Sequence, residues 1–445
     1  MRTRFTFVGA AAGVAVCLSA YGQDYSNTLG DPGFSGSYVS GFAVHDDGSG
    51  ESLYATGSFT ATGVAGTSLI ARWDGMGWNS VGGGLQNQYC NVLASFGGDL
   101  YAAGYFDTAG GVAGTAKIAR FDGTAWNPMD AQLELFLNSI WDMEVFDDGS
   151  GDALIVAGNY MAIGGNAGLD HLAKWDGSSF SSIGTSIGGA VPLIVLDVLG
   201  ADLGSGNTLF AGGRFLSIDG VAANNIAQWD GTTWTAMGDG VDRTSGFAQL
   251  FHMVAFDDGS GMALYAGGSF NLINGNEPVN NMAKWDGTTW SPVGDGFNSA
   301  VRGLQVFDDG TGEALYAMGN FTSSGATAVS HIAKWSGTEW KAVGAGFDDN
   351  AFRAIVFDAG EGEAMHIGGS FANADGMSSN RIVSLLSSAS CIADLNGDGN
   401  TDFLDISAFI SGYGGMDPSV DFNGDGNWDF LDISAFLASY SSGCP

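Results

Sequence analysis

The sequence has few basic residues: 14 Lys and Arg stand against 48 Asp and Glu, and the net charge is −34 at pH 7. Nucleic acids and anionic membranes both require a positive binding surface, so we expect neither nucleic acid as a partner nor membrane insertion. No apolar run of about 18 residues follows the N-terminal segment. The five histidines show no metal-ligand spacing, and nucleophile and phosphate-loop motifs are absent, so we assign no catalytic residue.

The N-terminal segment 1–22 has the pattern of a secretory signal peptide. Arg2 and Arg4 precede the apolar stretch FTFVGAAAGVAVCLSA, and Ala20 and Gly22 fit a small-x-small cleavage site. A lipoprotein signal at Cys17 is the alternative, which the bulky residue before that cysteine disfavours. We therefore expect a secreted, extracellular protein associated with a cell surface.

Cysteine is scarce, with four residues in the chain, of which Cys90, Cys391 and Cys444 follow the expected signal peptide. An exported protein can form disulfides. Cys391 and Cys444 bracket a duplicated acidic phrase, and we expect these two to pair and Cys90 to stay free. Other pairings of the three cysteines remain open.

Glycine, in contrast, is abundant, and its 73 residues recur at fixed places in a long repeat. Seven units contain a core such as ALYAGGSF, which follows an apolar run and an acidic turn of the type VFDDGSGD. A glycine-rich loop and a segment such as MAKWDGTTWSPVGDG come next. The first aromatic residue of that segment recurs every 48 to 56 residues, at Trp73, Phe121, Trp175, Trp229, Trp285 and Trp335. A period near 50 residues indicates a repeat architecture.

Each repeat reads as four short antiparallel strands, rich in β-branched and aromatic residues and separated by Asp-Gly or Gly-Gly turns. Four such strands form the blade of a β-propeller. Gly267-Gly268 followed by Trp285 and Trp290 resembles the repeat of kelch-type propellers, although units such as YATG and YAMG keep only one of the two glycines. We predict a seven-bladed β-propeller over 24–388.

The last repeat lacks a fourth strand before the C-terminal region. Near the N-terminus, YSNTLGDPGF echoes WSPVGDGF at 290–297, with Tyr25 in place of tryptophan and Leu29 in place of valine. We predict that an N-terminal strand, 24–36, completes the last blade. A loose N-terminal arm is the alternative.

Three further features of the repeats allow site hypotheses. The DDGSG turns favour ordinary hairpin loops over a set of cation sites, because no twelve-residue ligand pattern is present. Basic residues precede the first aromatic of five repeats, and their recurrence predicts ion pairs between repeats: Arg72, Arg120, Lys174, Lys284 and Lys334. Four residues that break the pattern before or within the first strands are candidates for the mouth of a central channel: Trp141, His252, Arg302 and Arg353.

The C-terminal segment 389–445 contains the phrase DLNGDGNTDFLD and its copy DFNGDGNWDFLD. Both place oxygen-bearing side chains at alternate positions around a glycine at position 6, which is the pattern of a calcium loop. We predict two Ca²⁺ ions, with these ligands: Asp394, Asn396, Asp398, Asn400, Asp402 and Asp405 in the first loop, and Asp421, Asn423, Asp425, Asn427, Asp429 and Asp432 in the second.

After each loop, apolar residues recur at helical spacing. We expect them to form the packing face of a small two-helix domain: Phe403, Ile406, Phe409, Ile410 and Tyr413, and Phe430, Ile433, Phe436, Leu437 and Tyr440. Calcium and a disulfide would supply much of the stability of so small a domain.

This duplicated loop and helix resemble a type I dockerin, and the flanking cysteines and the ending SSGCP resemble the bacterial GC-type dockerins. The resemblance implies docking to a cohesin-like module on a scaffold or cell surface. It places the partner-binding positions 10 and 11 of the loops at Phe403, Leu404, Phe430 and Leu431. Cellulosomal dockerins carry hydroxyl and basic residues in this region, whereas 391–445 has no Lys or Arg.

We therefore expect a non-catalytic recognition or scaffold propeller, with a glycan or protein ligand, that is anchored by a calcium-dependent dockerin–cohesin-type interaction. A carbohydrate-active or other hydrolytic propeller with the same tether is the alternative, and a surface-layer component is a third possibility. Paired carboxylates at the channel mouth would favour an enzyme, and an aromatic platform without them would favour a lectin-like binder.

Overall fold

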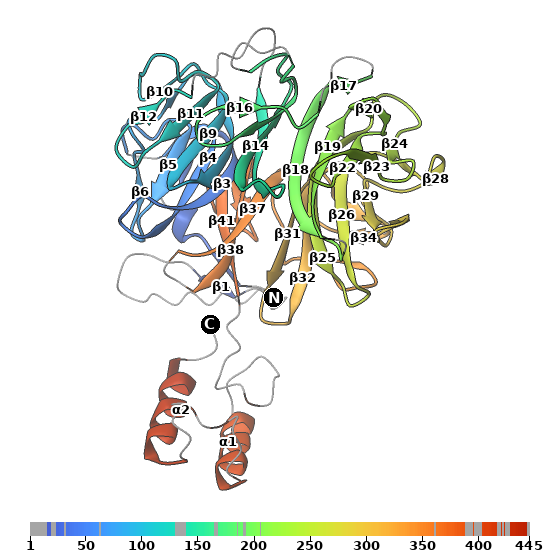
Figure 1. The fold of residues 1–445 in the computed structure, drawn as a ribbon. Coiled ribbons are helices and arrows are strands. Elements are labelled where there is room, and N and C mark those ends of the chain that lie inside the picture. Colours follow the sequence, from blue (N-terminus) through green and yellow to red (C-terminus); the bar gives the residue numbers. More distant parts are fainter. Residues whose placement is uncertain are drawn as a thin grey trace.

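The computed structural model describes residues 16–18, 24–30, 33–61, 64–129, 139–163, 168–184, 186–189, 193–204, 206–359, 362–387, 395, 403–415, 420, 422 and 428–442. Strands account for 52% of the residues and helices for 7%. The prediction of a mainly β chain that ends in two helices is therefore confirmed (Figure 1).

Seven antiparallel sheets make up the β part, and in the first six the four strands follow one another in chain order. The first sheet consists of β3 (Phe34–Asp46), β4 (Glu51–Ala61), β5 (Ile70–Trp73) and β6 (Trp78–Asn79). The second consists of β8 (Tyr89–Phe96), β9 (Asp99–Tyr105), β11 (Ile118–Phe121) and β12 (Trp126–Asn127), and the third of β13 (Ile140–Asp147), β14 (Asp152–Gly158), β15 (Leu172–Trp175) and β16 (Phe180–Ser181).

The later sheets repeat this arrangement. The fourth consists of β18 (Ile194–Asp202), β19 (Asn207–Arg214), β22 (Ile226–Trp229) and β23 (Trp234–Ala236), and the fifth of β25 (Gln249–Asp257), β26 (Met262–Ser269), β29 (Met282–Trp285) and β30 (Trp290–Pro292). The sixth consists of β31 (Val301–Asp308), β32 (Glu313–Gly319), β35 (Ile332–Trp335) and β36 (Trp340–Ala342).

The seventh sheet combines strands from both ends of the chain. β37 (Ala351–Asp358), β38 (Glu363–Gly369) and β41 (Ile382–Leu386) continue the pattern, and β2 (Asp24–Ser26) pairs with β41 in fourth place. β1 (Val16–Leu18), which falls within the expected signal peptide, pairs with β2. The fourth strand is shorter than the predicted 24–36, because a 3₁₀ turn at Thr28–Gly30 follows it and Phe34 begins β3.

Short strands of two residues in the loops form small additional sheets of two or three strands. They are β7 (Leu85–Gln86), β10 (Thr108–Ala109), β17 (Ile187–Gly188), β20 (Ser217–Ile218), β21 (Val221–Ala222), β24 (Val241–Asp242), β27 (Leu272–Ile273), β28 (Glu277–Pro278), β33 (Ser323–Ser324), β34 (Thr327–Ala328), β39 (Asn373–Ala374) and β40 (Met377–Ser378).

The first strands of the seven sheets contact one another in a closed order. Each of β3, β8, β13, β18, β25, β31 and β37 contacts the next, and β37 contacts β3. A sheet buries its faces only against another layer, so each sheet packs between two neighbours, and seven separate apolar clusters fill these spaces. The first strands therefore surround a common centre.

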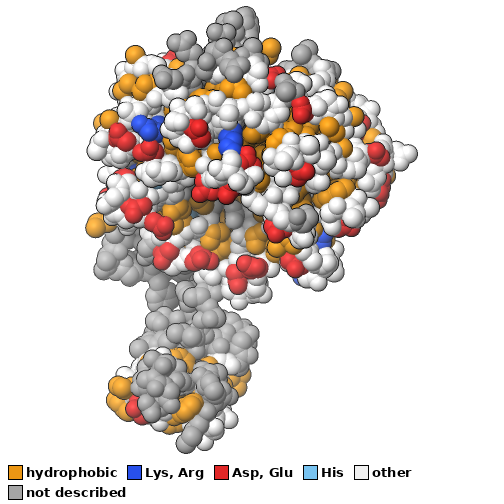
Figure 2. All heavy atoms as spheres, in the orientation of Figure 1, with side chains coloured by type: hydrophobic (Ala, Val, Ile, Leu, Met, Phe, Trp, Pro, Cys, Tyr) orange, Lys and Arg blue, Asp and Glu red, His pale blue; other side chains and the backbone are white. Residues whose placement is uncertain are grey.

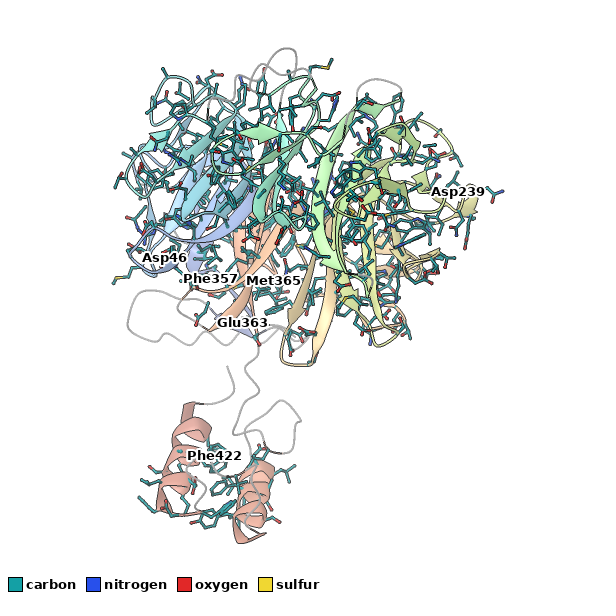
Figure 3. All side chains as sticks on the ribbon, in the orientation of Figure 1. Asp46, Asp239, Phe357, Glu363, Met365 and Phe422 are labelled. Carbon is teal, nitrogen blue, oxygen red and sulfur yellow. The ribbon has the colours of Figure 1, made fainter. Side chains whose placement is uncertain are left out.

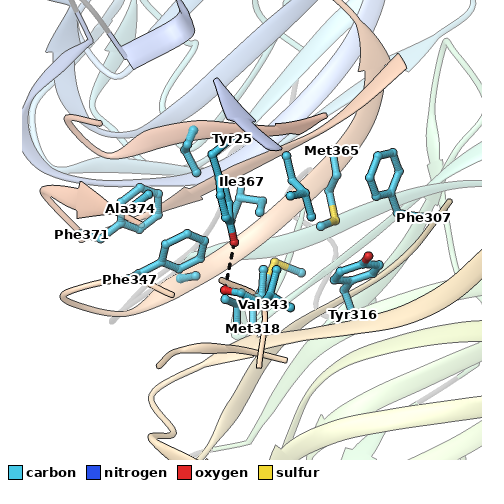
Figure 4. Close-up of a cluster of buried hydrophobic side chains, with 14 of the residues drawn as sticks. Tyr25, Phe307, Tyr316, Met318, Val343, Phe347, Met365, Ile367, Phe371 and Ala374 are labelled. Atoms are coloured by element: carbon cyan, nitrogen blue, oxygen red, sulfur yellow. Dashed lines mark hydrogen bonds between the residues drawn. The ribbon is translucent and has the colours of Figure 1, made fainter. Parts of the chain in front are cut away.

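The second aromatic residue of the repeat joins each sheet to the preceding one. Five indole N–H groups donate to a main-chain carbonyl of that sheet: Trp78 to Leu29 at 2.8 Å, Trp126 to Val81 at 3.1 Å, Trp234 to Ile183 at 2.5 Å, Trp290 to Met237 at 2.8 Å and Trp340 to Val293 at 3.1 Å. In the seventh sheet, the Tyr25 hydroxyl donates to the Val343 carbonyl at 3.4 Å (Figure 4). Tyr25 thus occupies the place of the tryptophan.

In the acidic turns, aspartate side chains accept hydrogen bonds from main-chain N–H groups of the same turn. In the first, one oxygen of Asp46 accepts the N–H groups of Gly48 and Gly50, both at 2.8 Å, and Asp47 accepts that of Ser49. The turns of five other sheets repeat one or both of these bonds. This geometry is that of Asx hairpin turns, which agrees with the favoured hairpin hypothesis.

The predicted ion pairs between repeats are wrong in their location. Lys174, Lys284 and Lys334 bind Asp148, Asp258 and Asp309 at 2.6, 2.9 and 2.6 Å, and each aspartate lies in the acidic turn of the same sheet as its lysine. Arg72 binds Asp47 in the same way at 3.0 Å. In these four sheets, therefore, the basic residue on the third strand fastens the turn of its own sheet.

The two helices are α1 (Phe403–Gly415) and α2 (Phe430–Ser442). Phe409 and Phe436 stack with their ring centroids 4.1 Å apart and an angle of 6° between the rings. Phe422 lies between the helices (Figure 3) and contacts both rings edge-on. These residues form an apolar cluster of the helices' own, with Val420 as its remaining fully buried member.

Candidate functional site

Every first strand carries a β-bulge at the same place. The register shifts occur between Val39 and Gly41, Cys90 and Val92, Ile140 and Asp142, Val195 and Asp197, Leu250 and His252, Val301 and Gly303, and Ala351 and Arg353. A bulge leaves one residue unpaired and re-aims its neighbours. The predicted channel residues Trp141 and Arg302 are the bulged residues of β13 and β31, and His252 and Arg353 directly follow the bulges of β25 and β37.

Side chains that follow the bulges bind the backbone of the next first strand. Asp142 accepts the N–H of Val198 at 2.9 Å, and Asp197 accepts that of Met253 at 2.7 Å. His252 Nδ1 accepts the N–H of Leu304, with 3.2 Å between the two nitrogens. A first strand is an edge strand, whose outward N–H groups have no partner in their own sheet. These bonds satisfy such groups.

The acid Asp197 is the centre of a group of ionisable side chains, which we call the central cluster: Asp142, Glu144, Asp197, His252 and Arg353. Both terminal nitrogens of Arg353 lie 3.4 Å from Asp197 Oδ1, and His252 Nε2 lies 3.8 Å from the same atom. Arg353 is in the seventh sheet and Asp197 in the fourth, so these two side chains meet across the middle of the circle of strands.

Burial changes the ionisation of this cluster. The pKa values of Asp142 and Asp197 are both raised by loss of solvent, and the neighbouring negative charge of Asp197 raises that of Asp142 further. The Arg353 guanidinium opposes this rise in both. Burial, followed by the charge of Asp142, raises the pKa of Glu144 to about 8. Two interacting carboxyl groups disfavour ionisation of both at once.

Stability should depend on the protonation of Glu144. Its folded pKa of about 8 exceeds its ordinary value of 4.5, so the folded chain binds this proton more tightly, and the stability it gives is lost as the pH rises through 8. Between pH 6 and pH 9 we expect the wild type to lose about 2.5 kcal/mol more unfolding free energy than Glu144→Gln. Urea denaturation at both pH values measures this difference. The exposed Glu51→Gln should behave as the wild type, and equal losses in all three proteins would contradict the prediction.

The sequence missed Asp142, Glu144 and Asp197 as functional candidates. A usable signal was present: WDMEVF and IVLDVLG carry acids at positions where the other five first strands have none. Only the closed arrangement of the strands brings Asp197 to Arg353, which is 156 residues away.

The predicted calcium ligands fall mostly outside the described residues. Of the twelve, the structure describes Asp405, Asp429 and Asp432. Asp405 and Asp432 are fully buried in the first turns of α1 and α2, and an oxygen of Asp432 accepts the N–H of Asp429 at 2.8 Å. Cys391 and Cys444 also lie outside the described residues, and Cys90 is a buried free thiol.

Both copies of the predicted partner-binding pair are exposed. Phe403 and Phe430 are each 75% exposed, and Leu404 and Leu431 are 56% and 57% exposed. The predicted packing face of the helices is wrong in part. Phe403 and Phe430 point to solvent, as do Ile410 and Leu437, whereas these residues pack in the cluster between the helices: Ile406, Phe409, Tyr413, Ile433, Phe436 and Tyr440.

Comparison with known proteins gives distant structural likenesses and no match in sequence. No family model matches the chain, and no curated protein matches it in sequence. The crystal structure of the extracellular domain of a protein described as a one-component system from B. thetaiotaomicron aligns with a TM-score of 0.46 and 11% identity. The alignment covers 79% of this chain but 39% of that one, so this chain spans about two fifths of its neighbour's length. Among the described residues, no helix is long and apolar enough to cross a membrane.

Proposed function

We propose that the protein is a secreted, non-catalytic recognition or scaffold propeller, held at a cell surface or scaffold by a calcium-dependent, dockerin-like C-terminal domain. The seven sheets would be the blades of a seven-bladed β-propeller over 24–388. Its support is the closed order of contacts among the first strands, together with four antiparallel strands in each of the first six sheets and five in the seventh.

The observation that carries the docking proposal is the equal exposure of two apolar pairs. Phe403-Leu404 and Phe430-Leu431 open two helices of the same length, and their exposed fractions agree within 1% between the copies. Large exposed aromatic and aliphatic residues are costly in water and typical of interface anchors. The chain therefore presents the same apolar surface twice, as a cohesin-like partner would require.

Calcium would fix the geometry of these surfaces. In each copy, the buried aspartate at position 12 lies two residues after the exposed phenylalanine, in the same first turn. If Asp405 and Asp432 ligate calcium, they couple the ion directly to the orientation of Phe403 and Phe430. Docking should then require calcium.

Substitution of both phenylalanines tests the docking surface. We expect the full-length Phe403→Asp/Phe430→Asp variant to lose at least tenfold in affinity for a cohesin-bearing cell-surface fraction, because each change replaces an apolar anchor with a charge. The matched control is Met76→Asp, which changes a residue that is 95% exposed in the first sheet. Retention measured with calcium and with EDTA gives the readout. Retention that survives either EDTA or the double substitution would overturn the proposal.

A hydrolytic enzyme is the second candidate, and the interaction of Asp142 with Asp197 favours it. Against it, Asp197 is 2% exposed, and both carboxyl groups already accept a backbone N–H from the next strand. Those contacts suit a structural role better than activation of a water molecule. Glycan turnover by the wild type that Asp142→Asn abolishes would establish the enzyme instead.

A further inference from the structure

Arg302 is a half-buried cation that lacks a carboxylate partner among the described residues. It is the bulged residue of β31, its guanidinium lies 4.1 Å from the ring centroid of Phe251, and its Nε donates to Asn320 Oδ1 at 2.8 Å. In contrast, Lys174, Lys284 and Lys334 each pair with an aspartate. Figure 2 shows how widely the acidic side chains are spread over one face of the molecule and how few basic ones accompany them.

This arrangement is unfavourable without a ligand. Burial lowers the pKa of Arg302, which reports that the cation has lost solvent without gaining a compensating anion. A planar guanidinium that rests on an aromatic ring holds its terminal nitrogens in a fixed fork, which matches the two oxygens of a carboxylate. Since no described residue supplies a carboxylate to Arg302, a bound anion would complete its surroundings.

The neighbouring residues suit a sugar. Bulged positions surround one end of the central circle of strands, and Trp141, Phe251 and Phe352 place partly exposed aromatic rings there. The indole N–H of Trp141 is itself buried, so the rings, and not this donor, form the surface that a sugar would meet. Aromatic faces pack against sugar rings, and hydroxyl groups need nearby donors and acceptors.

Solvent reaches the central cluster next to these rings. The side chains of Arg353 and His252 are 21% and 22% exposed. Asp142 and Glu144, which are partly exposed, can both donate and accept hydrogen bonds when protonated. Arg353 is paired with Asp197, so Arg302 is the cation at this end that could bind an anionic ligand.

We propose that this end of the central circle binds a carboxylate-bearing saccharide, with Arg302 holding the carboxylate and the bulged aromatic residues packing against the sugar. The proposal rests on the recognition function proposed above and names its ligand class. Arg302 would select uronic acids over the corresponding neutral sugars.

Calorimetric titration of the full, calcium-loaded chain tests the site. The probes are an oligogalacturonate and methyl glucuronide, each against its neutral counterpart of equal length. We expect the uronates to bind at least tenfold more tightly than the neutral sugars, since a charge-assisted bidentate contact is lost in the latter. Arg302→Gln should lose at least tenfold in uronate affinity. The affinity of Arg302→Lys should lie between those of Arg302→Gln and the wild type.

Arg243→Gln is the matched control, because Arg243 is exposed and its Nη1 binds the Ser269 hydroxyl. It should bind uronates as the wild type does. No uronate binding by the wild type, equal binding of neutral sugars, or full affinity in Arg302→Gln would each overturn the assignment. Thermal melting confirms that the variants fold. Because calcium-dependent retention through Phe403 and Phe430 uses a different surface, the docking proposal can fail or stand independently of this result.

Discussion

Removing calcium should unfold the two-helix domain and leave the seven sheets intact. Among the residues that the structure describes there, its apolar cluster has three buried apolar side chains: Phe409, Val420 and Phe436. So small a core contributes little net stability against the entropy of ordering the chain. We therefore expect the ions to supply most of the free energy that holds α1 against α2.

The negative charge of the two loops makes the two-helix domain still more dependent on calcium. Residues 391–445 contain no Lys or Arg, so no cation of the domain itself can offset the carboxylates of the two loops. Without calcium these groups repel one another, and Asp405 and Asp432 would be left buried without the ion that we expect them to bind. At calcium a thousandfold above the dissociation constant, each site stabilises the folded domain by about 4.1 kcal/mol.

Circular dichroism with and without EGTA measures the effect on the full chain. We expect the helical signal at 222 nm to disappear in EGTA and to return with calcium, while tryptophan fluorescence, which comes mainly from the sheets, stays constant. Magnesium is the ionic control, because it prefers a smaller, octahedral site. Helices that persist in EGTA with unchanged hydrogen-exchange protection would contradict the predicted calcium sites.

The sequence predicted the β part well because its signals are local. Period-2 alternation, Asp-Gly turns and spaced aromatics determine strands and hairpins over short distances, and these features repeat in every unit. Tyr25 could be matched to the tryptophan position by the residues that follow it in YSNTLGDPGF. The structure places it there, paired with Leu385 in β41.

Features that depend on the assembled sheets could not be predicted in this way. The contact of Arg353 with Asp197 joins residues 156 positions apart, and no local pattern encodes it. Recurrence at one position correctly indicated that Lys284 has a structural partner, but it could not distinguish its own sheet from the next. Helical spacing likewise identified α1 without separating Phe409, which is buried, from Phe403, which is exposed.

Tyr25→Ala should destabilise the sheets strongly, because Tyr25 joins the two ends of the β part. Its side chain is fully buried, its ring meets Phe347 edge-on at 6.2 Å, and its hydroxyl donates to the Val343 carbonyl of the sixth sheet (Figure 4). Truncation of a buried aromatic residue costs about 3–5 kcal/mol through lost contacts and the cavity left behind. The strand that carries it, β2, has only three residues and cannot compensate for such a loss.

Tyr25→Phe separates packing from hydrogen bonding at this position. It keeps the ring and removes a 3.4 Å hydrogen bond, so we expect a loss of about 0.5–1 kcal/mol. Urea unfolding followed by tryptophan fluorescence measures both variants, and Trp126→Ala, which removes the equivalent residue of the second sheet, provides the comparison. If the N-terminal strand closes the circle of sheets, Tyr25→Ala should cost as much as Trp126→Ala. A cost below about 1 kcal/mol would mean that the last sheet holds without its fourth strand, and that the N-terminal segment is the loose arm.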